Sequence, residues 1–327
     1  MNHYDAIVIG AGLSGMYQLH CLRKLGLATR VFEAGANVGG TWYWNRYPGA
    51  RFDSESWTYG YSFSEELLRE WEWSEHFSPQ PETLRYCNFV ADKLELRRDI
   101  EFNARIASAR YDEPANQWEI ATTDGRKARG RFLITAIGPL SAPTMPVIPG
   151  IEDFKGPSFH TSRWPHEPVR VEGKRVGILG TGATAVQAIT EIAKTVGHLT
   201  VLQRTPNWCA PLHNSRIDAE TQRRIKSSYA EIFAKCRETY GGFIHDADRR
   251  NALEVSPEVR EAFFEKRYSE PGFALWMGNF RDLLIDWDAN ATITDFMRRK
   301  IRERVKDPVL ADKLTPKDHG FGTRRVP

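Results

Sequence analysis

The chain has 327 residues, of which 41% are hydrophobic and 27% charged, as expected for a globular protein of about two domains. With 45 basic and 42 acidic residues, its charge gives no reason to expect nucleic acid or a membrane surface as a partner. The four cysteines are scattered without a Cys-x-x-Cys pair, which argues against a disulfide framework, a metal site and a redox dithiol, and favours a reducing, cytoplasmic setting.

The N-terminal segment has the pattern of a dinucleotide-binding turn. Residues 4–9 are apolar and predict a short buried parallel strand, and a helix is expected to follow the turn. Between them stands Gly-x-Gly-x-x-Gly, whose glycines allow a tight turn, the approach of a pyrophosphate and close helix packing. A second strand, 29–32, ends in an acid that can bind ribose hydroxyls. The residues expected to hold this first nucleotide are Gly10, Gly12, Ser14, Gly15 and Glu33.

The next stretch, residues 38–59, is a loop rich in glycine and aromatic residues. Its mixture of aromatic side chains with Pro and Gly is unfavourable for both helix and strand. One interpretation is a hydrophobic plug over the first domain. The other is a loop that lines a bound ligand, with Asp53 reaching the reaction centre.

Helices are expected at 64–76 and 82–96, and alternating segments from 100 to 122 suggest a β-meander. The apolar run 132–138 predicts a strand that returns to the first sheet. A series of prolines then marks a stiff linker. We therefore expect the first nucleotide domain to span residues 1–139.

The linker contains the pattern Phe-x-Gly-x-x-x-His-x-x-x-Trp-Pro and lies between two glycine-rich turns. Packing alone would explain a His and a Trp in such a connector. The other interpretation is a conformational role, in which the segment couples nucleotide binding to domain position. The residues of this pattern are Phe154, Gly156, His160 and Trp164.

A second dinucleotide turn follows the linker. The segments 175–179 and 198–203 predict two strands, and Gly-Thr-Gly-Ala-Thr-Ala between them opens a helix, with alanine tolerated at the third small position. The second strand is followed by Arg204 rather than an acid, and a guanidinium can pair with a 2′-phosphate that an acid would repel. This predicts NADP over NAD at the second turn. The NADP contacts expected here are Thr181, Gly182, Ala183, Thr184, Ala185, Val186, Gln187, Arg204 and Thr205.

The remainder of the chain is charged and helical. Residues 217–305 are expected to form a helical insertion after an NADP-binding domain at 140–216, and Asp307-Pro308 breaks the helical pattern. A return segment, 306–327, ends in paired arginines, for which a solvated terminus is the simplest interpretation.

These motifs together resemble the type I Baeyer–Villiger monooxygenases, within the flavin-containing monooxygenase superfamily. The resemblance covers nearly the whole chain and implies an α/β fold with two Rossmann-like domains, one for FAD and one for NADP, and a helical insertion. It implies FAD at the first turn, beside Glu33, with the aromatic loop lining its flavin ring. The further FAD contacts that it implies are Thr41, Trp42, Tyr43, Trp44, Asp53, Tyr59 and Ile106. It implies further NADP contacts at Arg51, Phe52, Asp53, Arg324 and Arg325.

The activity implied by the resemblance is a ketone oxygenation. NADPH reduces FAD, O2 adds at the flavin C4a carbon, and the resulting peroxide attacks a ketone to give an ester or lactone. Arg325 would be the catalytic cation and Asp53 would orient it. A small-molecule ketone is the expected partner, and a monomer is the expected state.

Two other functions remain open at this stage. One is an N- or S-oxygenating flavin monooxygenase, although the Trp-Pro ending of the linker pattern points away from it. The other is a non-catalytic, nucleotide-binding fragment, because members of the resembled family continue well beyond the arginine pair. On that interpretation little would hold Arg325 in place, and turnover would be poor.

Overall fold

The structure, a computed structural model, describes residues 2–323 and the backbone of 325–326. The chain forms two compact units, each built from two stretches of sequence. Unit 1 joins Met1–Tyr47 to Gln80–Val169, and unit 2 joins Pro48–Pro79 to Arg170–Pro327. The domain boundaries expected from the sequence stay predictions.

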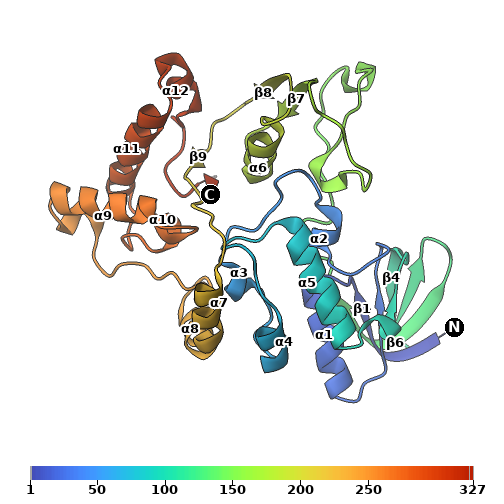
Figure 1. The fold of residues 1–327 in the computed structure, drawn as a ribbon. Coiled ribbons are helices and arrows are strands. Elements are labelled where there is room, and N and C mark those ends of the chain that lie inside the picture. The colour runs from blue at the N-terminus through green and yellow to red at the C-terminus, as the bar shows by residue number, and fades with distance from the viewer. Residues whose placement is uncertain (1, 324, 327) are drawn as a thin grey trace. The chain divides into compact units, whose positions relative to one another are not determined.

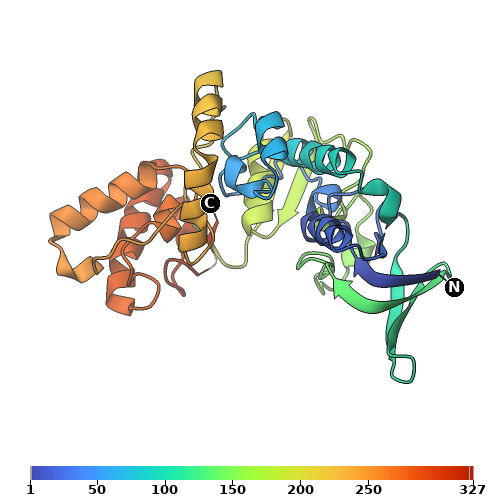
Figure 2. The same ribbon diagram turned by 90° about the horizontal axis from the view of Figure 1, so that it is seen from below.

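Unit 1 is organised around a six-stranded sheet in the order β3-β2-β1-β6-β5-β4. Strands β3, β2, β1 and β6 are parallel, and β5 and β4 form an antiparallel hairpin beside them. Figure 2 shows β1 and β6 side by side near the N-terminus, which confirms the expected return of the later strand to the first sheet. The strands are β1 Asn2–Ile9, β2 Thr29–Phe32, β3 Ile100–Glu101, β4 Ile106–Asp112, β5 Gln117–Thr122 and β6 Lys127–Thr135.

The helices of unit 1 lie beside this sheet. Helix α1 packs against β1 and β2, and α5 lies next to α1 in Figure 1. The middle of β1 is fully buried, as its apolar run predicted. The helical segments are α1 Leu13–Lys24, α2 Thr41–Trp44, α5 Gln80–Lys93, η1 Arg97–Asp99, η2 Ile151–Asp153 and η3 Thr161–Arg163.

Unit 2 begins with short helices and an extended segment. The helix predicted at 64–76 is wrong beyond its first half, because α4, Glu65–Glu70, ends at Trp71. The residues that follow are extended and form isolated bridges, Glu75 with Arg216 and Pro79 with Arg51. This extended course buries Trp73 and Phe77, so tertiary packing overrides local helix propensity here.

The second glycine turn of unit 2 lies between two parallel strands. Strand β7, Arg175–Leu179, pairs with β8, His198–Leu202, and helix α6, Ala183–Ile192, connects them. This strand–turn–helix–strand order confirms the second Rossmann-like element predicted from the sequence. Two further short strands, β9 Trp208–Cys209 and β10 Arg325–Val326, pair in parallel.

The helical insertion has its own hydrophobic core, to which α9, α10 and α11 contribute. These three helices lie close together in Figure 1. Side-chain caps begin several of its helices, and Ser256 and Asp286 accept hydrogen bonds from backbone N–H groups of the first turn. The helical pattern breaks at Asp307-Pro308 as expected, since α11 ends at Arg304, and Asp307 then caps one further helix. The helices of unit 2 are α3 Ser56–Tyr59, α4, α6, α7 Ala219–Ser227, α8 Tyr229–Glu238, η4 Ala252–Glu254, α9 Pro257–Ser269, α10 Ala274–Met277, α11 Trp287–Arg304 and α12 Pro308–Leu314.

The residues that precede the arginine pair are packed into this core. The ring of Phe321 is buried and stacks on Trp276 with centroids 4.2 Å apart. Asn290 accepts a hydrogen bond from the Phe321 N–H at 3.0 Å and donates one to the Phe321 carbonyl at 2.8 Å. The backbone leading to Arg325 is therefore held from the N-terminal side, which the sequence did not predict.

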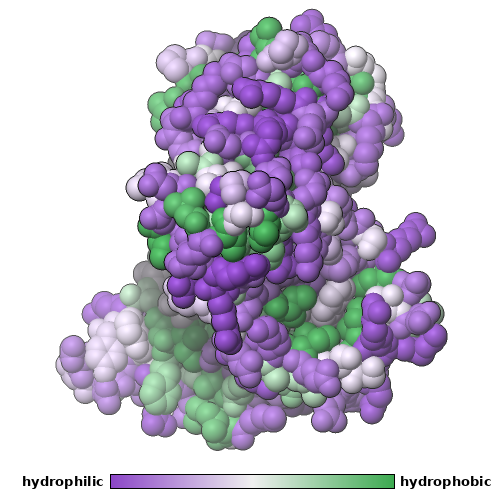
Figure 3. Space-filling view, turned by 90° about the vertical axis from the view of Figure 1, so that its left-hand side faces the viewer, coloured by the Kyte–Doolittle hydropathy of each residue, from purple (hydrophilic) through white to green (hydrophobic). Residues whose placement is uncertain are grey.

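Among the described residues, no helix is both long and apolar enough to cross a membrane. The face of the molecule in Figure 3 is mostly hydrophilic, with hydrophobic residues in separate patches. This distribution agrees with the high proportion of charged residues in the sequence.

Candidate nucleotide-binding sites

The first glycine turn has the geometry that a dinucleotide requires. Gly10 has a φ of +102°, and its N–H donates to the Phe32 carbonyl at 2.8 Å. Helix α1 starts directly after Gly12, so its unpaired N–H groups surround the turn. A Cβ on Gly15 would lie 1.8 Å from the Gly10 oxygen, so the helix packs on the turn with no room for a side chain.

Glu33 points at this turn. Its carboxylate is buried and accepts hydrogen bonds from the N–H groups of Ala11 and Gly35, both at 2.7 Å. A carboxylate has about four acceptor positions, so two remain for ribose hydroxyls. The side chain therefore lies where the sequence predicted a ribose ligand, while its contact with a nucleotide stays a prediction.

The aromatic loop begins against the same turn. The Gly39 N–H donates to the Ala11 carbonyl at 3.0 Å. Contrary to expectation, Thr41–Trp44 is a single helical turn, closed by a hydrogen bond from the Trp44 N–H to the Gly40 carbonyl at 3.1 Å. The structure thus brings Thr41, Trp42, Tyr43 and Trp44 next to the first turn. Trp42 is buried, whereas Thr41, Tyr43 and Trp44 are half-buried.

Ile106, another expected flavin contact, lies apart from these residues in sequence. It begins β4 and packs against the sheet core formed around Ile7 and Ile120. Packing in the core accounts for this side chain, and the flavin contact expected there stays a prediction.

The linker pattern forms a short, largely exposed segment. His160 caps η3, with its Nδ1 2.8 Å from the Ser162 hydroxyl oxygen. Phe154 is 66% exposed and covers Gly156, where a Cβ would lie 2.6 Å from the Phe154 ring. Trp164 lies 5.6 Å from the Phe159 ring between centroids. These contacts are local, and a conformational role for the pattern stays a prediction.

Two neighbours of this pattern contact the aromatic loop, and neither contact was predicted from the sequence. The Arg163 guanidinium lies over the Trp44 ring at 5.2 Å, and His166 lies 5.2 Å from the Tyr43 ring. Burial lowers the pKa of His166, and the nearby Arg46 lowers it further. The sequence feature that could have indicated these two residues is their position next to the linker pattern.

The second turn has nearly the same backbone geometry as the first. Gly180 has a φ of +101°, and its N–H donates to the Leu202 carbonyl at 2.9 Å. Gly182 precedes α6 at φ −74° and ψ 177°, against φ −76° and ψ −171° for Gly12 before α1. In both turns the helix starts with an N–H···O bond of 3.0 Å to this glycine. The same backbone cradle for a pyrophosphate is therefore present twice.

The end of β8 carries the positive charge that the sequence predicted. Thr181 donates its hydroxyl to the Thr205 carbonyl at 3.1 Å, and Asn207, which the sequence reasoning missed, donates to the Thr181 carbonyl. Arg204 is exposed and borders a cavity of about 480 Å³. The charged residues that line this cavity are Arg204, Asp312, Lys313, Lys317 and Asp318.

The two lysines of this cavity were also missed, because they follow Arg204 by more than a hundred residues. Lys317 forms an ion pair with Asp312 at 2.6 Å, which offsets part of its charge. The Gln203 side chain donates a hydrogen bond to the Lys313 carbonyl at 2.7 Å, which fixes the backbone of Lys313 beside β8. The described residues thus bring three cations and two carboxylates to this cavity, at the place where a 2′-phosphate is expected.

A loop that carries three expected NADP contacts is joined to α6. Gln187 donates to the Arg51 carbonyl at 3.1 Å and to Asp53 Oδ1 at 3.2 Å. A Cβ on Gly49, whose φ is +83°, would lie 2.4 Å from the Gln187 carbonyl. Phe52 stacks on a further aromatic residue of unit 2, Tyr59, with centroids 4.3 Å apart. The structure therefore brings Arg51, Phe52, Asp53 and Gln187 together within unit 2.

The arginine pair is described only in part. Arg324 lies outside the described residues, and of Arg325 only the backbone is described, paired with Trp208 in β10. Strand β10 also contacts α6, so this backbone lies beside the second nucleotide element. The roles expected for both arginine side chains stay predictions.

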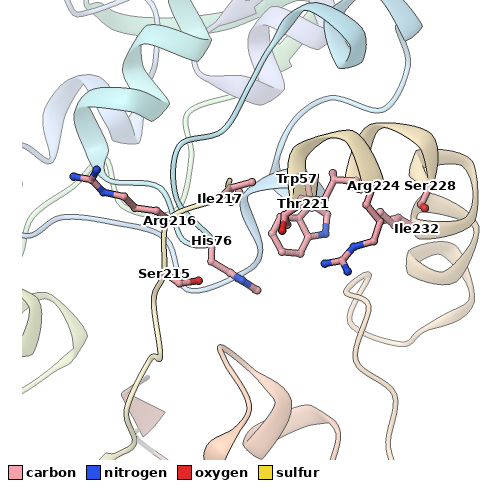
Figure 4. A pocket seen from close by; sticks show the side chains of 10 residues that line it. Trp57, His76, Ser215, Arg216, Ile217, Thr221, Arg224, Ser228 and Ile232 are labelled. Carbon is pink, nitrogen blue, oxygen red and sulfur yellow. The ribbon is translucent and has the colours of Figure 1, made fainter. Parts of the chain in front are cut away.

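A second cavity of about 490 Å³ lies between α3, α7 and α8 (Figure 4). The rings of Trp57 and His76 lie 4.5 Å apart at its edge, and Arg216 extends away from the other labelled side chains. None of the described residues expected at a nucleotide site lines it. Its lining residues are Trp57, His76, Ser215, Arg216, Ile217, Thr221, Arg224, Ile225, Ser228 and Ile232.

Two glycine turns, one ending in a carboxylate and one in a guanidinium, define an α/β protein of the class that holds two dinucleotides. A family model described as "Flavin-binding monooxygenase-like" matches residues 4–217, which is more than half of the chain. The protein belongs to this family.

Individual relatives match over nearly the whole chain. It is 49% identical to the 2-oxo-Delta(3)-4,5,5-trimethylcyclopentenylacetyl-CoA monooxygenase of Pseudomonas putida, over 99% of this chain and 60% of that protein. It is 44% identical to the acetone monooxygenase (methyl acetate-forming) of Gordonia sp. strain TY-5, over 99% and 60% respectively. The crystal structure of OTEMO in complex with FAD and NADP has a TM-score of 0.96 at 49% identity, covering 99% of this chain and 62% of that one. The chain thus spans about 60% of the length of the curated relatives it matches.

Proposed function

We propose that this protein is a Baeyer–Villiger monooxygenase that uses FAD, NADPH and O2 to convert a ketone into an ester or lactone. The observation that carries the proposal is the duplicated turn, which ends in Glu33 in unit 1 and in Arg204 in unit 2. The name of one relative describes the conversion of acetone, a ketone, into methyl acetate, an ester. A solved relative contains FAD together with NADP.

The residues present fit both cofactors. At the first turn, buried Glu33 keeps acceptor positions for ribose, and the N-terminus of α1 can receive a pyrophosphate. At the second turn, the N-terminus of α6 offers the same contacts, and Arg204 supplies a cation for a 2′-phosphate. FAD, reduced by NADPH, would supply the oxygen-transfer chemistry when bound.

The contribution of the protein is binding and orientation. Gln187 fixes the Asp53 carboxylate and the Arg51 carbonyl, so the loop between them has a defined position on α6. We assign Arg325 the role of stabilising negative charge that develops on the substrate oxygen, with Asp53 as the group that orients its guanidinium. The support for these roles is the position of the Arg325 backbone next to α6.

The proposal is tested by turnover of the 327-residue chain reconstituted with FAD. We expect a bound-flavin spectrum, NADPH consumption that a ketone stimulates, and an ester or lactone as the product. Parallel reactions with an amine and a sulfide separate the ketone oxygenase from an N- or S-oxygenating enzyme. Cofactor binding without any turnover would instead support a nucleotide-binding role, and oxidation of the amine or sulfide alone would refute the ketone assignment.

Replacement of Glu33 by alanine is expected to weaken FAD binding by about 10- to 100-fold, because charge-assisted hydrogen bonds contribute about 1.5–3 kcal/mol. Quenching of flavin fluorescence during titration of the apoprotein measures this change. Glu113→Ala, in the exposed turn between β4 and β5, is the matched control and should leave the affinity unchanged. An equal effect of both variants would show that Glu33 does not contact the nucleotide.

A further inference from the structure

A buried contact between a carboxylate and an imidazole connects the helical insertion to the loop that carries Asp53. Glu55, two residues after Asp53, precedes α3, and its side chain is only 1% exposed. His245, from the segment between α8 and η4, places its Nε2 2.7 Å from Glu55 Oε1, and its side chain is 14% exposed. Neither residue stood out in the sequence. Among the described residues, the second carboxylate oxygen, Oε2, is buried without a hydrogen-bond partner.

Other titratable groups lie near Glu55 but do not take the place of His245 as its hydrogen-bond partner. Glu55 acts electrostatically on His76, whose pKa burial lowers, and on Cys236, whose pKa burial raises and Glu55 raises further. Neither group supplies a hydrogen bond to the carboxylate in the described part of the chain. A Cβ on Gly272 would lie 3.3 Å from Glu55 Oε1, so the insertion also closes over it sterically. Since an unpaired buried carboxylate is costly, the hydrogen bond with His245 is expected to hold Glu55 in place.

Other contacts within the described part of unit 2 also hold the loop before Glu55. On one side, Gln187 of α6 binds Arg51 and Asp53. On another side, the Arg51 guanidinium donates to Glu75 Oε2 at 3.0 Å and to the Phe77 carbonyl at 3.2 Å. The contact with His245 adds a further point of attachment, which comes from the insertion.

We propose that Glu55 and His245 are positioning residues, through which the helical insertion holds the Arg51–Asp53 loop in its NADP-binding position on α6. This inference rests on the proposed function, because it assumes that the loop contacts NADP. Removing one partner leaves the other buried without compensation, whereas removing both leaves no isolated charge. The losses in NADP affinity are therefore expected to be strongly non-additive.

The test is a double-mutant cycle on NADP+ binding to the full chain, measured by calorimetry, with thermal unfolding measured in parallel. Glu55→Gln and His245→Gln are each expected to raise the dissociation constant about tenfold, and the double variant no more than either single variant. His245→Lys, whose ammonium can donate a hydrogen bond to the Glu55 carboxylate, should recover most of the affinity. The matched control is Glu261→Gln, which removes the Arg299–Glu261 pair of the insertion, whose side chains are 50% and 51% exposed. It should change neither the affinity nor the stability measurably.

A merely structural role predicts a different result. Folded single variants would then unfold at lower temperature with an unchanged dissociation constant for NADP+, and that outcome overturns the inference, as do losses that simply add. If only the double variant folds, an unchanged dissociation constant in that variant overturns it as well. Arg204→Ala, measured in the same series, distinguishes failure of the proposed function from failure of the positioning role. If the chain shows no preference for NADP+ over NAD+ that depends on Arg204, the proposed function fails. If that preference is present and the pair variants behave like the control, the positioning role alone fails.

Discussion

Gly15→Ala is expected to destabilise unit 1 by about 3 kcal/mol or more, at the upper end of the cost of overpacking. The added Cβ would lie 1.8 Å from the Gly10 oxygen and 2.9 Å from the Gly10 carbonyl carbon, and both are backbone atoms of the turn. Relief requires α1 to move away from the turn. That movement would also displace the helix N-terminus from the position expected for the first pyrophosphate.

Urea unfolding followed by circular dichroism measures this loss, and flavin titration of the folded fraction measures its effect on binding. Gly182→Ala in the second turn is the control, because nothing lies within 4 Å of a Cβ at that position. Its φ of −74° suits any residue, so its stability should stay within about 0.5 kcal/mol of the parent protein. A comparable loss of stability in both variants would mean that the close approach at Gly15 is not what destabilises the chain.

The parts of the fold that could be predicted from the sequence depend on local patterns. A buried apolar run followed by glycines and a helix requires only neighbouring residues, so β1 with α1 and β7 with α6 were both predicted. The pairing of β6 with β1 followed from another apolar run that ends at glycine. The acid and the arginine that end β2 and β8 also stand at fixed offsets from these turns.

The failures occurred where distant contacts decide the structure. The helix predicted through residue 76 stops at Glu70, because the next residues pair with Arg216 and bury two aromatic rings. The contact of Gln187 with Asp53 joins residues 134 positions apart, and that of His245 with Glu55 joins residues 190 apart. No periodicity or motif reports such pairs, and only the folded chain shows that Pro48–Pro79 belongs with the second glycine turn.

In the candidate NADP site, too, some residues could be predicted from the sequence and others could not. Arg204 was found because it ends β8, whereas Lys313 and Lys317 reach the same cavity only through the packing of α12 and the residues after it. In the sequence these lysines are ordinary surface charges. Their position beside Arg204 changes what should be expected when the arginine is removed, because part of the positive potential would remain.

Arg204→Ala is expected to raise the dissociation constant for NADP+ about 10- to 100-fold while that for NAD+ changes little, because only NADP carries the 2′-phosphate. Calorimetric titrations with both nucleotides measure the ratio, and 2′,5′-ADP isolates the phosphate contact. Arg216→Ala is the matched control, since Arg216 borders the other cavity (Figure 4). Arg204→Lys should give an intermediate ratio, because an ammonium keeps the charge without the planar fork that pairs with phosphate.

The size of the effect also reports on the neighbouring lysines. Lys317 is paired with Asp312, so its charge is partly offset, whereas among the described residues Lys313 has no ion pair. If these ammonium groups take over part of the contact, Arg204→Ala will keep some preference for NADP+, and that remainder will fall as salt is added. A parallel loss of affinity for both nucleotides would place the guanidinium away from the 2′-phosphate, and the assignment of NADP to the second turn would then lose its electrostatic basis.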